Sequence, residues 1–196
     1  MFIAAPDDSA DTARIYKTTS DAQGFVMNLA KAWAWRPDVF EGFASLRGQL
    51  ATQSALTKRD QAVMVCAMAS QLGDAYCSLA WGGALSREAG ASVAAAVITN
   101  ADASVLTSRD RALADWARKV ARNPNETSAP DIAVLRAAGL GDRDIFEATV
   151  FVAFRLAFST VNDALGIAPD WQLAEALTPE VRAAVSYGRQ VASRPV

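Results

Sequence analysis

The residues best suited to chemistry lie in one short segment, Leu72–Trp81, which holds a carboxylate, a phenol, a thiol and an indole. Asp74 and Cys77 are three residues apart, so on a helix that begins near Asp74 they share the first turn. A helix N-terminus can lower the pKa of a thiol and so produce the nucleophilic thiolate. Asp74 opposes that effect, because a neighbouring negative charge disfavours a thiolate. We therefore expect Cys77 to keep a thiol pKa at or above the unperturbed value of about 8.5.

Each of these residues also has a purely structural interpretation. Asp74 follows a glycine and precedes an apolar run, as an ordinary helix N-cap does. Cys77 is also consistent with a small buried apolar residue, and Cys66 is expected in the core. A disulfide between the two cysteines would require their Cα atoms to lie within about 7 Å. Trp81 is expected to form core or pocket wall, because its indole N–H donates but cannot act as a base.

The composition excludes several kinds of site. The chain has 196 residues, no histidine and two cysteines. It therefore lacks the residues for Ser-His-Asp or Cys-His catalysis, for imidazole metal ligands and for a thiolate zinc site. The three acidic residues at the start of the long helix are expected to interact with the helix dipole rather than to bind a metal; they are Asp142, Asp144 and Glu147. A net charge of −2 gives no basic face for nucleic acid. We expect no metal and no cofactor.

The hydropathy pattern predicts a cytoplasmic protein without a membrane span. The longest apolar stretch, Ala148–Ala164, is interrupted by Arg155, Asn162 and Asp163 and stays short of the roughly 18 uncharged residues that a span needs. The apolar start Met1–Ala5 is followed by acidic residues and lacks a basic region, so we expect no export signal. Two thiols in a chain of this length suit a reducing compartment.

Apolar residues recur at helical spacing in almost every segment, and strict alternation is hard to find. The pattern predicts an all-α fold, a helical bundle that forms one domain with halves of approximately 1–100 and 101–196. The long apolar helix near the C-terminus is expected at the centre of the bundle or in a subunit interface. The expected helices cover 24–36, 37–46, 58–72, 74–90, 92–99, 108–122, 129–138, 142–166 and a segment that starts at 178–180.

One motif is repeated. Leu56–Ala62 recurs as Leu106–Ala112, each with an Arg-Asp pair near a helix start. Either helix starts simply use similar capping residues, or two copies of a helical unit pack around a pseudo-two-fold axis. We expect the Arg-Asp pairs at 59–60 and 109–110 to be solvated surface charges.

Five segments, in this order, resemble the long peroxidase-related members of the alkylhydroperoxidase D-like and carboxymuconolactone decarboxylase-like superfamily. They are Gly24–Leu29, Leu56–Ala62, Leu106–Leu113, Leu135–Leu140 and Asp163–Gly166. The resemblance spans most of the chain. It implies an all-α helical bundle of that type, a homo-oligomer, and thiol-dependent reduction of peroxides.

The resemblance also implies a site. Redox members carry a Glu, a Cys-x-x-Cys pair at a helix start and a His four residues after the second Cys. Here the second Cys falls on Cys77, whereas the Glu, the first Cys and the His fall on Ala62, Asp74 and Trp81. In that pattern the Glu and His relay a proton, the second thiol attacks peroxide, and the first resolves the sulfenic acid. Positioned acid–base groups contribute roughly 10²–10⁴-fold, so we expect an impaired or inactive peroxidase.

Three functions stay open. The first is a peroxidase-like oxidoreductase acting through Cys77, and the second is a non-catalytic oligomeric scaffold or small-molecule-binding protein. The third is a cofactor-free decarboxylase-like enzyme in which a buried Asp74 acts as an acid or base. Gly82-Gly83 inside a predicted helix implies a close backbone approach, or room for a ligand beside Tyr76 and Trp81.

The expected homo-oligomer has two candidate surfaces, because contiguous apolar area on a monomer is better explained as a subunit interface. One is the smooth apolar face of the predicted helix 92–99, and the other is a run of aromatic residues on the long helix. The residues are Val93, Ala94, Ala96, Val97, Phe151, Phe154 and Phe158. The alternative is that both faces are simply core.

Overall fold

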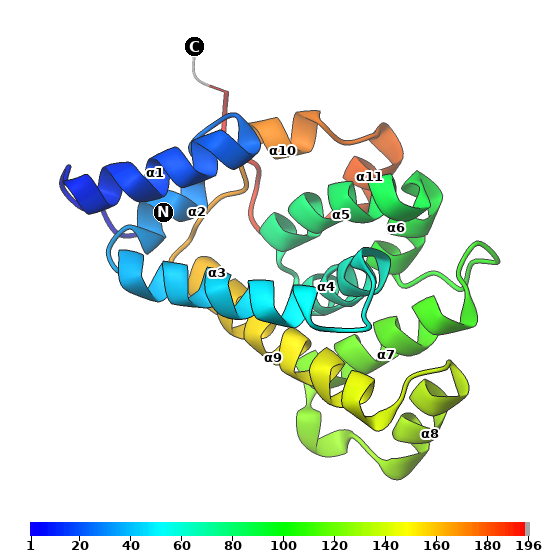
Figure 1. The fold of residues 1–196 in the computed structure, drawn as a ribbon. Coiled ribbons are helices and arrows are strands. Elements are labelled where there is room, and N and C mark those ends of the chain that lie inside the picture. The colour runs from blue at the N-terminus through cyan, green and yellow to red at the C-terminus, as the bar shows by residue number, and fades with distance from the viewer. Residues whose placement is uncertain (195–196) are drawn as a thin grey trace.

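The computed structural model describes residues 1–194 and confirms the predicted all-α class. Within these residues the chain forms eleven α-helices, one 3₁₀ helix and no β-strand (Figure 1). The helices are α1 (Ala10–Gln23), α2 (Asn28–Trp33), α3 (Pro37–Thr52), α4 (Lys58–Leu72), α5 (Ala75–Ala89), α6 (Ala91–Thr99), α7 (Ser108–Arg122), η1 (Pro124–Glu126), α8 (Ala129–Ala137), α9 (Asp142–Ala164), α10 (Trp171–Glu175) and α11 (Pro179–Ala184).

Helix α4 is the most deeply buried element, and α5, α7, α6 and α9 surround it (Figure 1). Every residue from Asp60 to Ala69 is buried, which is why this segment shows no polar face in the sequence. One apolar cluster draws side chains from both halves of the chain, from Leu56 to Ala184. The two halves therefore both contribute to this main cluster, and two smaller clusters hold the apolar side chains of the N-terminal helices.

Local capping residues set the bounds of the central helices as predicted. The hydroxyls of Thr57 and Thr107 accept from the backbone N–H groups of the aspartates three residues on, and each forms a complete capping box. Gly73 ends α4 in the left-handed conformation, at φ +72°. Asp74 then caps α5.

The N-terminal segment differs from the prediction of one helix over 24–36. Helix α1 was not expected, and only α2 occupies the predicted range. Gly24, at φ +82°, ends α1, and Ser9 caps its start by accepting from the Thr12 N–H. Only three residues of α1 are buried, so its sequence carries little apolar periodicity. Helix α10 was not predicted for the same reason, because it has five residues and only one of them is buried.

The two Arg-Asp motifs form ion pairs between buried carboxylates and partly exposed arginines, and are not the solvated charges that we expected. Asp60 and Asp110 are 3% and 2% exposed. Arg59 donates to both carboxylate oxygens of Asp110, at 2.9 and 2.6 Å. Arg109 donates in the same way to Asp60, at 3.0 Å for each bond. The arginine at the start of each of the helices α4 and α7 thus pairs with the aspartate at the start of the other helix. Two copies of a helical unit around a pseudo-two-fold axis would form such reciprocal pairs.

Helix α9 lies along one side of the bundle and not at its centre (Figure 1). One face, which includes Ile145 and Phe151, is buried, whereas Phe146 and Phe154 on the other face are 68% and 38% exposed. Most of the residues that we expected in a subunit interface are instead buried within the chain itself. They are Val93, Ala94, Ala96, Val97, Phe151 and Phe158. Among the described helices, none is both long enough and apolar enough to traverse a bilayer.

Candidate functional site

A cavity of about 360 Å³ opens beside Cys77. Its walls come from α1, α2, α3, α5, α9 and α10, so the unpredicted helices α1 and α10 help to enclose it. Three of the predicted site residues line it: Tyr76, Cys77 and Trp81. Asp74 and Ala62 are absent from its lining in the part of the chain that the structure describes.

Cys77 places a thiol in the wall of this cavity, and the surroundings keep that thiol protonated. The residue is 2% exposed, and burial raises the pKa of its thiol to about 12. The charge of Arg155 lowers that pKa, and its guanidinium Nη2 lies 3.5 Å from Sγ. Ser159 Oγ, 3.3 Å from Sγ, acts in the same direction. The direction is the one expected from the sequence, although burial rather than Asp74 is the main cause.

Asp74 is the N-cap of α5, as the sequence predicts. Its Oδ1 accepts from the backbone N–H of Cys77 at 2.9 Å, and its charge adds to the rise in the pKa of that thiol. The residue is 0% exposed. Its Oδ2 has no hydrogen-bond partner within residues 1–194. Asp74 therefore influences the thiol from inside the protein and does not face the cavity.

Residues 185–194, which we call the C-terminal strap, pass against the α4–α5 junction that holds Asp74. Gly188 lies so near the α4–α5 junction that a Cβ on it would come within 2.3 Å of the Gly73 carbonyl oxygen. Its φ is +73°, a conformation that glycine adopts without strain. Beside it, the hydroxyls of Tyr187 and Ser78 are hydrogen-bonded at 2.8 Å. The strap thus packs against the residues on either side of the buried Asp74.

Tyr76 connects the cavity wall to the N-terminal helices. Its hydroxyl donates to the Asp170 carboxylate, and it accepts from the backbone N–H of Leu29 at 3.4 Å. Asp170 also accepts from the N–H of Asn28 at 2.9 Å. Burial raises the pKa of Tyr76, and the charge of Asp170 raises it further. Both facts indicate that Tyr76 stays protonated and orients the wall of the cavity.

Arg155 is a cavity residue that the sequence analysis did not select. It is 6% exposed, and its guanidinium carbon lies 5.0 Å from the Trp81 ring centroid and 5.1 Å from that of Phe158. Positive charge over two aromatic faces is a stabilising arrangement. Trp81 therefore serves as a wall that holds the arginine. The available signal was Arg155 as a single basic residue inside the apolar stretch Ala148–Ala164.

The remaining predicted features belong to the core. Ala62 is 1% exposed and packs in the main apolar cluster. Cys66 is buried, and neither it nor Cys77 is in a disulfide. A Cβ on Gly82 would lie 3.0 Å from atoms of Ile98 and Val181. The glycine pair therefore allows α5 to approach neighbouring side chains and does not leave room for a ligand.

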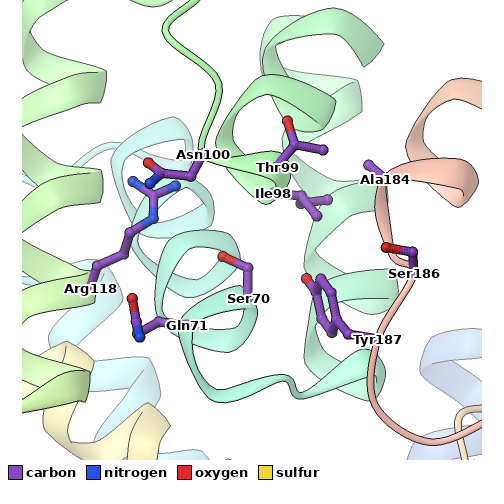
Figure 2. Close-up of a pocket in the computed structure, with 9 residues that line it drawn as sticks. All are labelled: Ser70, Gln71, Ile98, Thr99, Asn100, Arg118, Ala184, Ser186 and Tyr187. Atoms are coloured by element: carbon purple, nitrogen blue, oxygen red, sulfur yellow. The ribbon is translucent and has the colours of Figure 1, made fainter.

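A second cavity, of about 380 Å³, lies between the ends of α4 and α6, α7, and the start of the strap (Figure 2). Its lining contains no cysteine and no acidic side chain in the described chain. Arg118 already donates to the Val97 carbonyl oxygen. Residues 1–194 contain no group of three or more side chains suited to hold a metal ion. We therefore place the candidate site at Cys77.

Comparison with known proteins identifies the fold. No family model and no curated protein sequence matches the chain. A solved structure of a peroxidase-related protein from Ralstonia eutropha, described as an alkylhydroperoxidase AhpD core, matches with a TM-score of 0.74 and 25% identity over 96% of this chain and 97% of that one. The chain belongs to the alkylhydroperoxidase D-like superfamily.

Two further solved structures are similar in fold. A peroxidase-related protein from a Silicibacter species has a TM-score of 0.74 and 24% identity, with 86% of this chain and 90% of that chain covered. The debrominase Bmp8, in a cysteine-to-alanine variant complexed with 2,3,4-tribromopyrrole, also has a TM-score of 0.74. Its identity is 13%, over 89% of this chain and 95% of that one, so it is similar in fold alone.

Proposed function

We propose that this alkylhydroperoxidase D-like protein binds a small molecule in the cavity beside Cys77 and does not reduce peroxides with that cysteine. The supporting observation is a cavity of about 360 Å³ whose wall includes a buried thiol with its pKa raised to about 12. The thiolate is the nucleophile toward peroxide, and such a thiol is almost entirely protonated near neutral pH. The cavity is also within the size range of small-molecule sites.

The positions of the other predicted site residues support this choice. Asp74 supplies a carboxylate instead of a second thiol, and Ala62 and Trp81 supply no proton relay. The decarboxylase-like alternative needs Asp74 to meet a substrate. Asp74 is fully buried and outside the cavity lining within the described residues, so that alternative loses its acid–base group.

The debrominase complex supports the ligand-binding part at the level of the fold. A protein of 13% identity and the same architecture holds a small heterocycle, 2,3,4-tribromopyrrole. A cavity-filling variant tests whether this chain does the same. Ala80 lines the cavity, and Ala80→Leu is expected to remove the thermal shifts that a panel of small aromatic molecules produces. Ala153→Leu, on the exposed face of α9, is the matched control. Shifts that survive Ala80→Leu would place binding elsewhere.

One observation favours a second function, peroxide reduction by a single cysteine. Arg155 and Ser159 both donate toward Cys77 Sγ and favour its thiolate. In that reaction the thiolate attacks the peroxide O–O bond, the sulfur becomes a sulfenic acid, and an alcohol or water leaves. Two equivalents of an external thiol then reduce the sulfenic acid and leave as a disulfide.

A peroxide-consumption assay with dithiothreitol separates the two functions. We expect wild type, Cys77→Ser and the control Cys66→Ser to consume hydrogen peroxide at equal rates. A rate that depends on Cys77 and survives Cys66→Ser would overturn our proposal and establish the one-cysteine peroxidase.

A further inference from the structure

We propose that the cavity beside Cys77 is an anion site that holds a small monocarboxylate with an apolar or aromatic body, bound through Arg155 and Arg47. This inference rests on the proposed function, because it names the ligand class of the same cavity. It follows from the charges, the burial and the hydrogen bonds of the side chains that line the cavity.

Arg155 is a buried cation without a carboxylate partner. It is 6% exposed, lines the cavity, and forms no ion pair with any residue in 1–194. Its Nη2 donates to the neutral sulfur of Cys77, and its Nε has no partner among the described residues. A buried charge is unfavourable unless it is paired. A carboxylate in the cavity would supply the missing partner, and a guanidinium can bind it with two parallel hydrogen bonds.

The charged side chains that line the cavity in residues 1–194 are all arginines. Arg47 and Arg87 also line it, whereas no aspartate or glutamate does so within the part of the chain described. Protein atoms packed around the guanidinium of Arg47 lower its pKa although the residue is partly open to solvent, and the nearby charge of Arg155 lowers that pKa further. Two arginines repel each other because both are positively charged, and one anion bound between them would attract both. Arg47 remains solvent-exposed, which places it toward the opening, whereas Arg155 is inside.

The rest of the lining is largely apolar. It includes Met27, Leu29, Phe40, Phe158 and Leu173. A bare inorganic anion would leave these side chains without contact, whereas an apolar body would bury its surface against them, which is favourable. One charged end and one apolar body together describe an amphipathic monocarboxylate. Trp81 and Phe158 hold the guanidinium of Arg155 by their faces, so the cation is positioned before a ligand arrives.

Calorimetric titration of the full chain with three probes tests the inference. Phenylacetate carries the carboxylate, phenylacetamide has the same shape without charge, and inorganic phosphate has charge without an apolar body. We expect phenylacetate to bind at least about tenfold more tightly than either, the effect of one charge-assisted hydrogen bond. Arg155→Met is expected to abolish that preference, and Arg47→Gln to reduce it severalfold.

Arg136→Gln is the matched control, because Arg136 is an exposed arginine paired with Asp142 and is not part of the cavity lining. It should leave the preference unchanged. Circular dichroism shows whether Arg155→Met folds. If Arg155→Met does not fold, Arg47→Gln still tests the inference, because Arg47 is at an exposed position.

The remaining outcomes of these titrations each contradict one part of the inference. Equal binding of acid and amide, absence of phenylacetate binding, or unchanged preference in both arginine variants would overturn the anion site. Phosphate binding as tightly as phenylacetate would overturn the apolar part of the ligand. Peroxide turnover that depends on Cys77 would instead refute the proposed function, and it has no bearing on the acid-to-amide ratio.

Discussion

The guanidinium of Arg155 and the thiol of Cys77 are in contact, with Nη2 3.5 Å from Sγ. The contact joins two residues that are distant in the sequence, one in the first turn of α5 and the other in the middle of α9. It gives the thiol a cation that favours ionisation, while burial and Asp74 oppose it. The reactivity of Cys77 therefore depends on opposing effects on its thiol pKa, and the charges of Arg155 and Asp74 can each be removed by a single substitution.

Asp74→Asn is expected to make Cys77 more reactive. The asparagine keeps the N-cap, because it accepts from the same backbone N–H, but it removes the negative charge that raises the thiol pKa. Alkylation of Cys77 by iodoacetamide near pH 9, followed by mass spectrometry in a Cys66→Ser background, should accelerate about threefold to tenfold. Arg155→Met should slow it. Equal rates in all three proteins would contradict this balance of charges.

Asp163→Asn is expected to stabilise the protein at pH 8 but not at pH 4. Burial raises the pKa of Asp163 to about 6, and the nearby Asp74 contributes to the rise. A carboxyl with a raised pKa binds its proton more tightly when folded, so stability falls as pH rises from about 4 to about 6. Because Asp163 is only half-buried, we expect the variant to gain about 1 kcal/mol in urea unfolding at pH 8. An equal gain at both pH values would refute the ionisation as its cause.

The Arg59–Asp110 pair is expected to stabilise the fold through a direct coupling. Hydrogen bonds from Arg59 and Thr107 outweigh burial and lower the pKa of Asp110, so the contribution is present at neutral pH and is lost as the carboxylate is protonated in acid. A double-mutant cycle with Arg59→Gln and Asp110→Asn should give about 1–3 kcal/mol of coupling.

The exposed pair Arg136–Asp142 is the control for that cycle. Its side chains are 57% and 79% exposed. Surface pairs of this kind contribute less than about 1 kcal/mol, so its coupling should be the smaller of the two. Coupling of equal size in both pairs would contradict a special role for burial at the α4–α7 contact.

Gly188→Ala is expected to loosen the C-terminal strap. The added methyl would lie 2.3 Å from a backbone oxygen, and φ at +73° disfavours a side chain in any case. We expect a loss of about 1–3 kcal/mol and faster hydrogen exchange at residues 74–78, because the strap packs against that junction. Gly42→Ala, where a Cβ meets nothing within 4 Å, is the control. Unchanged exchange at 74–78 in Gly188→Ala would show that the strap does not protect Asp74.

The homo-oligomer remains a prediction, and the structure redirects it to a different surface. Phe146 on α9 is 68% exposed, and Val134 on α8 is 56% exposed. We expect light scattering at micromolar concentration to show an oligomer that Phe146→Asp dissociates, since a charge in an apolar interface is costly. A monomeric wild type would refute the oligomer, and an intact Phe146→Asp oligomer would exclude this surface.

The sequence predicted the features that depend on neighbouring residues and missed those that depend on distant ones. Thr57, Thr107 and Asp74 cap helices through bonds to N–H groups three residues away, so their roles are visible in the local pattern. The Arg59–Asp110 pair spans 51 residues, and its two motifs look like ordinary helix starts. Arg155 was visible only as an interruption of an apolar run, because Cys77 and Trp81, which it contacts, lie on another helix.

The exchange of arginines between α4 and α7 also has a consequence for how the chain can be divided. Each helix start carries an aspartate whose cation comes from the other half, so neither half alone neutralises its buried carboxylate. Residues 100–107, between α6 and α7, form the loop where the chain can be cut without breaking a helix. Fragments made at that loop should be unstable separately and should reassemble when mixed, each providing the counter-ion of the other.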